Sequence, residues 1–335
     1  MTTTFVSDLT RELTHAANAA TLAPSVHNTQ PWRFHIDGPV LEIHADPARQ
    51  LAVLDPTGRQ LFVSLGCALF NARARLAADG VAVRVEIAPE QANETLAARL
   101  IVDAEQRIDA DVAALAPALV ARQTNRREFT DNAVPDALIA AWQAAVAAEG
   151  AALCQVTRSS DRLALSRLSQ RADEYQLLDP AYRAELRSWT DHDDRRRDGI
   201  RPAVVPHVDG TAREEVPIRD FDTNGHGWLP AATNATHDQS LFVLCTAGDS
   251  RAEWIRAGQA IERAWLALTR AGFTASVFTQ VIEVGSLRVQ LQHELRLPGR
   301  PHLVFRVGKA PVAAFSRRRP LSQVLSVADD EASRP

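Results

Sequence analysis

Cysteine and lysine are scarce in this chain, and no apolar run approaches the length needed to cross a bilayer. The three cysteines, Cys67, Cys154 and Cys245, are far apart and form no C-x-x-C pair. Their spacing argues against a disulfide framework and against a zinc site, and it favours buried free thiols in a reducing compartment. The N-terminal segment has charged side chains and no apolar h-region, so we expect a cytoplasmic protein that does not bind membranes.

Several familiar signature motifs are also missing. The sequence has no G-x-S-x-G, no G-x-x-x-x-G-K-[ST] and no G-x-G-x-x-G, so hydrolase, P-loop and Rossmann interpretations lose their usual support. The metal-capable stretch Asp191-His192-Asp193-Asp194 lies in a charge-rich segment, far in sequence from His226 and His237. The sequence therefore predicts no metal site.

Positive charge comes almost entirely from arginine. Lys309 is the single lysine among 37 basic residues, and the formal net charge is −4. That balance argues against nucleic-acid binding, which usually needs a clustered basic excess. A guanidinium group can donate two parallel hydrogen bonds to a phosphate.

With 335 residues and 46 % hydrophobic content, the chain can form one large domain or two ordinary ones, with a sizeable core.

Hydrophobic periodicity predicts helices around short strands in both parts of the chain. We expect helices over 5–22, 59–76, 134–150, 161–175, 251–271 and 287–295, and strands over 32–36, 40–45, 81–87, 96–103, 152–156, 240–247 and 302–307, with 273–278 of uncertain type. Between about 179 and 240 the composition shifts to charge and proline. A long insert of that kind is usually a lid, a binding loop or disordered.

Two loops carry the clearest chemical signal. Residues 23–34 combine turn-forming residues with Pro31, which has no N–H, and this predicts a rigid loop that offers backbone amides to something flat. In the segment 122–129, the pattern Arg122-x-Thr124-x-Arg126 places two guanidinium groups and a hydroxyl where they can hold an anion through charge-assisted bonds, each worth roughly 1.5–3 kcal/mol. The basic tail at Arg317 and Arg319 is similar. Each segment has an alternative without a ligand. Residues 23–34 could be an ordinary helix-to-strand connection, 122–129 a solvated loop, and the tail a disordered basic end.

These stretches resemble flavin-dependent nitroreductases. Residues 23–32 resemble the family loop P-S-S-x-N-x-Q-P-W, 122–129 resemble R-x-S-x-R-x-F, and 272–276, 280–283 and 301–308 resemble the family's C-terminal half. The closest resemblance is to the Acg-like branch, in which two nitroreductase-like halves share one chain. It implies an α/β (α+β) protein, a nitroreductase-like α/β/α sandwich. That sandwich would be an internal pseudo-dimer of halves 1–116 and 117–335, with a lid-like insert at about 179–240.

The resemblance implies one FMN per chain, in a site shared by the two halves, with no metal and no obligatory catalytic side chain. Arg122, Thr124 and Arg126 would hold the phosphate and ribityl end, and Ser25 and Asn28 would meet the isoalloxazine edge. The full set of implied cofactor-binding residues is Ser25, His27, Asn28, Gln30, Arg122, Gln123, Thr124, Arg126, Gln280, Ile282, Arg317 and Arg319. Val26 and His27 depart from the family pattern, which removes one hydroxyl contact.

The implied activity is NAD(P)H-dependent two-electron reduction of nitroaromatics or quinones in ping-pong order. NADH or NADPH and a small aromatic electron acceptor would be the partners, and the cofactor would carry the chemistry. The alternative is an FMN-sequestering or storage protein, in which the insert, with Trp189 and Trp228, shields the flavin and leaves little or no reductase activity. The sequence leaves the oligomeric state open between a monomer and a homodimer.

Overall fold

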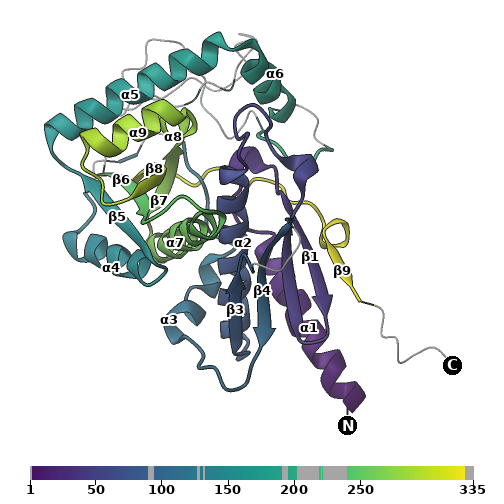
Figure 1. Cartoon of the computed structure of the whole chain (residues 1–335). Coiled ribbons are helices and arrows are strands. Elements are labelled where there is room, and N and C mark those ends of the chain that lie inside the picture. Colours follow the sequence, from purple (N-terminus) through teal and green to yellow (C-terminus); the bar gives the residue numbers. More distant parts are fainter. Residues whose placement is uncertain are drawn as a thin grey trace.

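The computed structural model describes residues 2–89, 94–126, 129–130, 133–190, 195–201, 219, 221 and 240–328. Two β-sheets flank a pair of central helices, α2 (Arg59–Ala78) and α7 (Arg251–Arg270), in an α+β arrangement (Figure 1). The largest hydrophobic cluster includes side chains from both central helices and from both sheets. One core therefore joins the two sheets, and smaller clusters lie beside it, one of them between the second sheet and the helices α5 (Ser159–Leu178), α8 (Gln280–Glu283) and α9 (Gly285–Glu294).

The first sheet has the strand order β3-β4-β2-β1-β9. Its strands are β1 (Trp32–Asp37), β2 (Val40–Ala45), β3 (Val83–Ile87), β4 (Leu96–Val102) and β9 (Leu325–Val327). β1 and β2 form the predicted hairpin, whose turn contains Gly38 at φ +51°. β9 pairs in parallel with β1, so the C-terminal segment crosses the molecule from the second sheet to the edge of the first (Figure 1).

The second sheet has the order β5-β6-β8-β7, and all its pairs are antiparallel. Its strands are β5 (Ala151–Val156), β6 (Ser240–Thr246), β7 (Thr274–Phe278) and β8 (Arg300–Gly308). The segment of uncertain type, 273–278, is thus mostly strand. The other described helices are α1 (Thr2–Ala20), α3 (Ala110–Ala113), α4 (Asp136–Ala147), α5 (Ser159–Leu178), α6 (Pro180–Trp189), α8 (Gln280–Glu283) and α9 (Gly285–Glu294).

The two central helices meet at a pair of glycines. A Cβ atom on Gly66 would lie 2.1 Å from the Ile255 carbonyl oxygen, and one on Gly258 would lie 2.0 Å from that of Val63. Real Cβ contacts do not approach that distance, so only glycine lets the backbones come this close. The crossing fixes the loops that lead into and out of these helices relative to one another.

Helix α2 is long and apolar enough to cross a membrane by length and composition alone. In the fold it is a core helix, because 78 % of its most apolar window is buried inside the protein. The expectation that no apolar run approaches the length needed to cross a bilayer is therefore wrong for α2, and it is burial, not length or composition, that marks α2 as a core helix.

The described part of the insert is partly helical. α6, which the sequence analysis did not anticipate, packs Tyr182 and Leu186 against Leu51, Ile200 and Phe221. Trp228 and Asp191-His192-Asp193-Asp194 lie outside the described residues, so their predicted roles stay predictions.

Candidate functional site

Two adjoining cavities lie at the loop at 22–28 and the segment at 119–126, and the C-terminal segment lines the first of them. We call the first the outer compartment; it is lined by Leu22, Pro24, Ser25, His27, Asn28, Leu119, Val120, Arg122, Gln123, Thr124, Arg126, Ile200, Ala314, Phe315, Ser316 and Arg318. The inner compartment adds Val26, Gln60, Val63, Ser64, Cys67, Arg219, Phe221, Ile261, Trp265, Val277, Thr279 and Leu303. Both compartments are lined by Pro24, Ser25, His27, Thr124 and Arg126, so they lie next to each other.

The first predicted loop is a tight bend with unusual backbone angles. His27, Asn28 and Gln30 have φ values of +45°, +53° and +51°. Non-glycine residues in this region cost on the order of 1–3 kcal/mol each and persist only where the surroundings fix them. Part of that support comes from Ser25, whose Oγ accepts a hydrogen bond from the Gln30 N–H at 3.0 Å. Ser25 and His27 line both compartments, as the prediction requires of residues that contact a ligand.

Asn28 lines the outer compartment, but its amide also ties three chain segments together. Its Nδ2 donates to the carbonyl oxygens of Gly199 (3.0 Å) and Arg317 (3.3 Å). Its Oδ1 accepts from Arg318 Nη1 at 3.0 Å. The loop, the insert and the C-terminal segment therefore meet at this side chain.

Gln30 makes a similar connection from a fully buried position behind the cavity wall. Its Nε2 donates to the Arg197 carbonyl at 2.8 Å, and its Oε1 accepts from the Arg319 backbone N–H at 2.7 Å. Gln30 lines neither compartment, so the structure brings it beside the site but not onto its surface.

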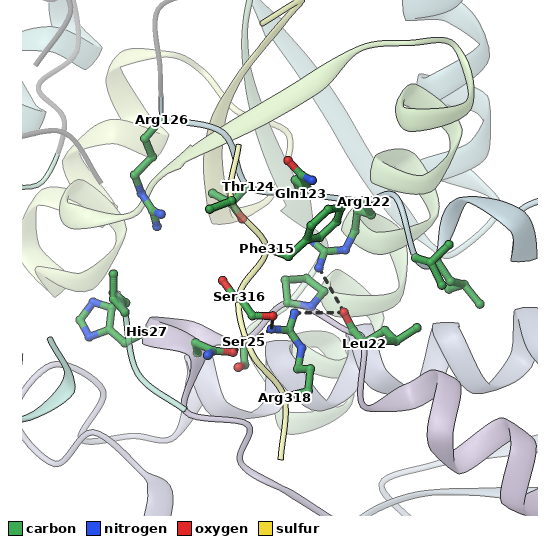
Figure 2. A pocket seen from close by; sticks show the side chains of 16 residues that line it. Leu22, Ser25, His27, Arg122, Gln123, Thr124, Arg126, Phe315, Ser316 and Arg318 are labelled. Atoms are coloured by element: carbon green, nitrogen blue, oxygen red, sulfur yellow. Dashed lines mark hydrogen bonds between the residues drawn. The ribbon is translucent and has the colours of Figure 1, made fainter. Parts of the chain in front are cut away.

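Two guanidinium groups converge on the carbonyl oxygen of Leu22 (Figure 2). Arg122 Nη2 and Arg318 Nη2 each donate to it at 3.1 Å. Arg122 also stacks over the Trp265 ring at 5.1 Å, and its Nε lies 3.2 Å from Glu262 Oε1. Arg318 Nε is buried and has no hydrogen-bond partner among the described residues.

Gln123 and Thr124 come from the same segment as Arg122. Gln123 Oε1 accepts from the Ala313 N–H at 3.0 Å, which ties this segment to the C-terminal one. Thr124 forms an isolated β-bridge with Ala275 and lines both compartments. The sequence prediction therefore identified a segment whose residues do meet at one cavity.

The outer compartment carries an excess of positive charge. Partial burial and the neighbouring Arg219 lower the pKa of Arg126 to about 10, and burial and Arg122 lower the pKa of Arg318 to about 9. Among the described residues no carboxylate pairs with Arg126, and Glu262 pairs with Arg122. Burial and like charges disfavour the charged form of these two arginines, and a bound anion would favour it.

Gln280, Ile282, Arg317 and Arg319 line neither compartment. The Ile282 carbonyl accepts from Arg59 Nη2 at 2.7 Å, and Gln280 is buried with its Nε2 unpartnered among the described residues. The cofactor roles of these four residues stay predictions. In the C-terminal segment, Arg318 is the arginine that lines the cavity, and sequence reasoning missed it.

Two residues of the insert reach the inner compartment. Arg219 pairs with Glu283 at 2.7 Å, and the Phe221 ring lies edge-on to His27 at 5.8 Å and under the Arg126 guanidinium at 5.3 Å. Burial, with Arg219 and Arg126 nearby, holds the pKa of His27 well below its usual range, so the imidazole is neutral. No composition signal marked Arg219 or Phe221 in the sequence.

Curated relatives match almost the whole chain. “Putative NAD(P)H nitroreductase Rv3131” of Mycobacterium tuberculosis (strain ATCC 25618 / H37Rv) is 32 % identical over 311 residues, 91 % of this chain and 88 % of that protein. “Uncharacterized protein Rv3127” of the same strain is 28 % identical, over 94 % of this chain and 93 % of that protein. “Putative NAD(P)H nitroreductase acg” is 26 % identical, over 93 % and 94 % respectively.

A scan against protein-family models gave no match. Among solved structures, a nitroreductase with bound FMN from Desulfitobacterium hafniense DCB-2 aligns with a TM-score of 0.41 and 10 % identity, over 64 % of this chain and 98 % of that one. The FMN- and NADPH-dependent nitroreductase NfnB from sphigopyxis sp. strain HMH aligns with a TM-score of 0.39 and 15 % identity, over 63 % of this chain and 97 % of that one. On the sequence relationship to its curated relatives, the chain belongs to the NAD(P)H nitroreductase family, in the branch that includes Acg.

Proposed function

We propose that the two compartments bind one FMN per chain. The observation that carries this proposal is that a cationic cavity shares five lining residues with a second cavity whose lining combines polar groups with Trp265 and aliphatic side chains. Arg122, Arg126 and Arg318 would hold a phosphate, because buried cations need a counter-charge. Trp265 and the apolar side chains of the inner compartment suit a flat ring.

The donor chemistry of the site fits this cofactor. Arg318 Nε and His27 Nδ1 are buried polar atoms with no partner among the described residues, and Thr124 supplies a hydroxyl to both compartments.

We propose that the loaded protein reduces nitroaromatics or quinones with NADH or NADPH, in ping-pong order. FMN, when bound, supplies reversible acceptance of a hydride and its transfer as two electrons. The protein's own residues orient the ligand and place fixed positive charge, chiefly Arg126, at the junction of the compartments. Such a charge favours an anion that develops there. No side chain of the site is required as an acid or a base.

The two halves and their insert are part of the same proposal. Residues 1–116 supply Ser25 and Asn28, while 117–335 supply Arg122 and Arg318, so one composite site forms per chain. The close crossing of α2 and α7 at Gly66 supports this arrangement, because it joins the halves as an interface would. We place the protein in the cytoplasm, as a monomer or a homodimer.

A flavin store is the second candidate, and one observation favours it. Phe221 is 3 % exposed and lies against His27 and Arg126, so a residue of the insert covers part of the inner compartment. A nicotinamide that must reach a ring in this compartment would have to pass or displace that side chain.

Anaerobic mixing separates the two candidates. The purified protein, reconstituted with FMN, should be yellow with one flavin per chain, and NADH or NADPH should bleach the flavin band of a reductase within seconds. A store would stay yellow with both nucleotides, and Phe221→Ala would then accelerate bleaching. A colourless protein that ignores added FMN would refute the proposal as a whole.

A further inference from the structure

A buried carboxylate lies directly behind the arginines of the outer compartment. The side chain of Glu262, on α7, is fully buried, and its Oε1 lies 3.2 Å from Arg122 Nε. The Asn71 amide, oriented with its nitrogen toward Glu262, donates to Oε1 at 2.9 Å and accepts from the Ala23 N–H at 3.1 Å. Oε2 of Glu262 has no hydrogen-bond partner among the described residues. One oxygen is therefore engaged, and the other can carry a proton.

The charged and titratable groups around Glu262 come from three segments. Arg122 belongs to the segment after residue 118, Arg318 to the C-terminal segment, and the Cys67 thiol to α2. Burial raises the pKa of the Glu262 carboxyl to about 7, against the opposing effects of Arg122, Arg318 and the Asn71 amide. Burial and Glu262 both raise the pKa of Cys67, so the thiol stays neutral.

We propose that Glu262 is the positioning residue of the outer compartment, which orients Arg122 in the ligand-free protein and takes up a proton when a phosphate group binds at Arg122 and Arg318. This inference rests on the proposed binding of FMN. Electrostatics gives the reason. Arg122 and Arg318 are the two cations that favour the charged form of Glu262. A dianionic phosphate bound at these two guanidinium groups would offset their effect and repel the buried carboxylate, so a proton from solvent would bind at Oε2.

Isothermal titration calorimetry measures this proton uptake. FMN is titrated into the protein at pH 8 in two buffers of different ionisation enthalpy, where the phosphate is already a dianion because its second pKa is about 6. The wild-type protein should take up about 0.5–1 proton per flavin, of which Arg318 supplies roughly 0.1. Its FMN affinity should also fall about five- to tenfold between pH 6.5 and pH 8.

Three variants make the result specific. Glu262→Gln should still bind FMN, take up no more than about 0.2 proton and keep its affinity within about twofold over the same pH range. Glu262→Asp keeps the charge and should restore the uptake. Glu149→Gln is the matched control, since Glu149 is a buried partner of Arg73 and Arg263 outside both compartments, and it should behave as wild type.

Equal proton uptake in the wild type and in Glu262→Gln would overturn the inference, as would flavin binding without proton uptake. If FMN does not bind the wild type at all, the proposed function fails separately. Sulfate, a dianion at both pH values, is then the probe. It should raise the melting temperature more at pH 6.5 than at pH 8 in the wild type but not in Glu262→Gln, and the same increase in both proteins would overturn the inference.

Discussion

Arg318 provides the sharpest test of the outer compartment, because its neighbour Arg317 serves as a control. The sequence pattern assigns a phosphate-binding role to Arg317 and Arg319, whereas the structure has Arg318 lining the cavity. Replacing Arg318 with alanine removes a buried guanidinium whose Nε has no partner among the described residues. A hydrogen bond to a charged group is worth about 1.5–3 kcal/mol, so FMN should bind roughly 10- to 150-fold more weakly.

The same substitution also removes hydrogen bonds that hold the first loop. Arg318 donates to the carbonyl oxygens of Leu22 and Ala23 and to Asn28 Oδ1. Circular dichroism and a melting curve should therefore accompany each FMN titration, followed by quenching of flavin fluorescence. Arg318→Lys keeps the charge but loses the planar fork, and we expect an intermediate loss of affinity.

The comparison between neighbours decides the outcome. Arg317→Ala should change FMN affinity by less than about threefold, because a side chain that does not line the cavity makes no direct bond to the ligand. The reasoning is refuted if Arg317→Ala weakens binding as much as Arg318→Ala does, or if a folded Arg318→Ala protein binds FMN with wild-type affinity.

The remaining predictions concern stability and access. Gly66→Ala should lower the free energy of unfolding in urea by about 3 kcal/mol or more, because its Cβ would meet the Ile255 carbonyl, while Gly285→Ala, with open space around it, should cost less than 1 kcal/mol. Burial lowers the pKa of His302 to about 3 in the folded protein. As the pH falls below about 6.5, His302 is therefore protonated in the unfolded chain while it stays neutral in the folded one. Between pH 7 and 4.5 this should remove about 2–3 kcal/mol of stability, and a urea series at each pH should show a shallower decline for His302→Gln. Phe221→Ala should raise the rate of anaerobic flavin reduction in stopped flow; an unchanged rate would show that this ring does not limit access.

Local chemistry explains why most secondary structure and the two site loops could be predicted. The hairpin at Gly38, the long periodic helices and the turn-rich loop at 23–34 are determined by short-range sequence signals. The strand β9 could not be predicted in the same way, since a three-residue strand has little periodicity and its pairing with β1 depends on distant residues.

Side-chain direction accounts for the differences at the site. In the segment 317–319, Arg318 lines the cavity while its two neighbours do not. Adjacent side chains of an extended segment point to opposite sides, and the sequence alone does not determine which side faces the cavity. Asn28 lines the outer compartment and Gln30 lies behind it, and their bonds to Gly199 and Arg197 depend on the path of the insert. Glu262 gave no signal, because a single acidic residue in an amphipathic helix usually lies in solvent.

The path of the C-terminal segment has a consequence for the order of folding. Asn28 and Arg318 are 290 residues apart in sequence, and contacts of that separation carry a high loop-closure cost. We therefore expect the outer compartment to form late in folding, after both sheets can hold the segment that runs from β8 to β9. A ligand bound there would stabilise the complete molecule against unfolding rather than one local unit. Cleavage between residues 309 and 320 would then abolish the ligand-induced rise in melting temperature, even where both sheets keep their other strands.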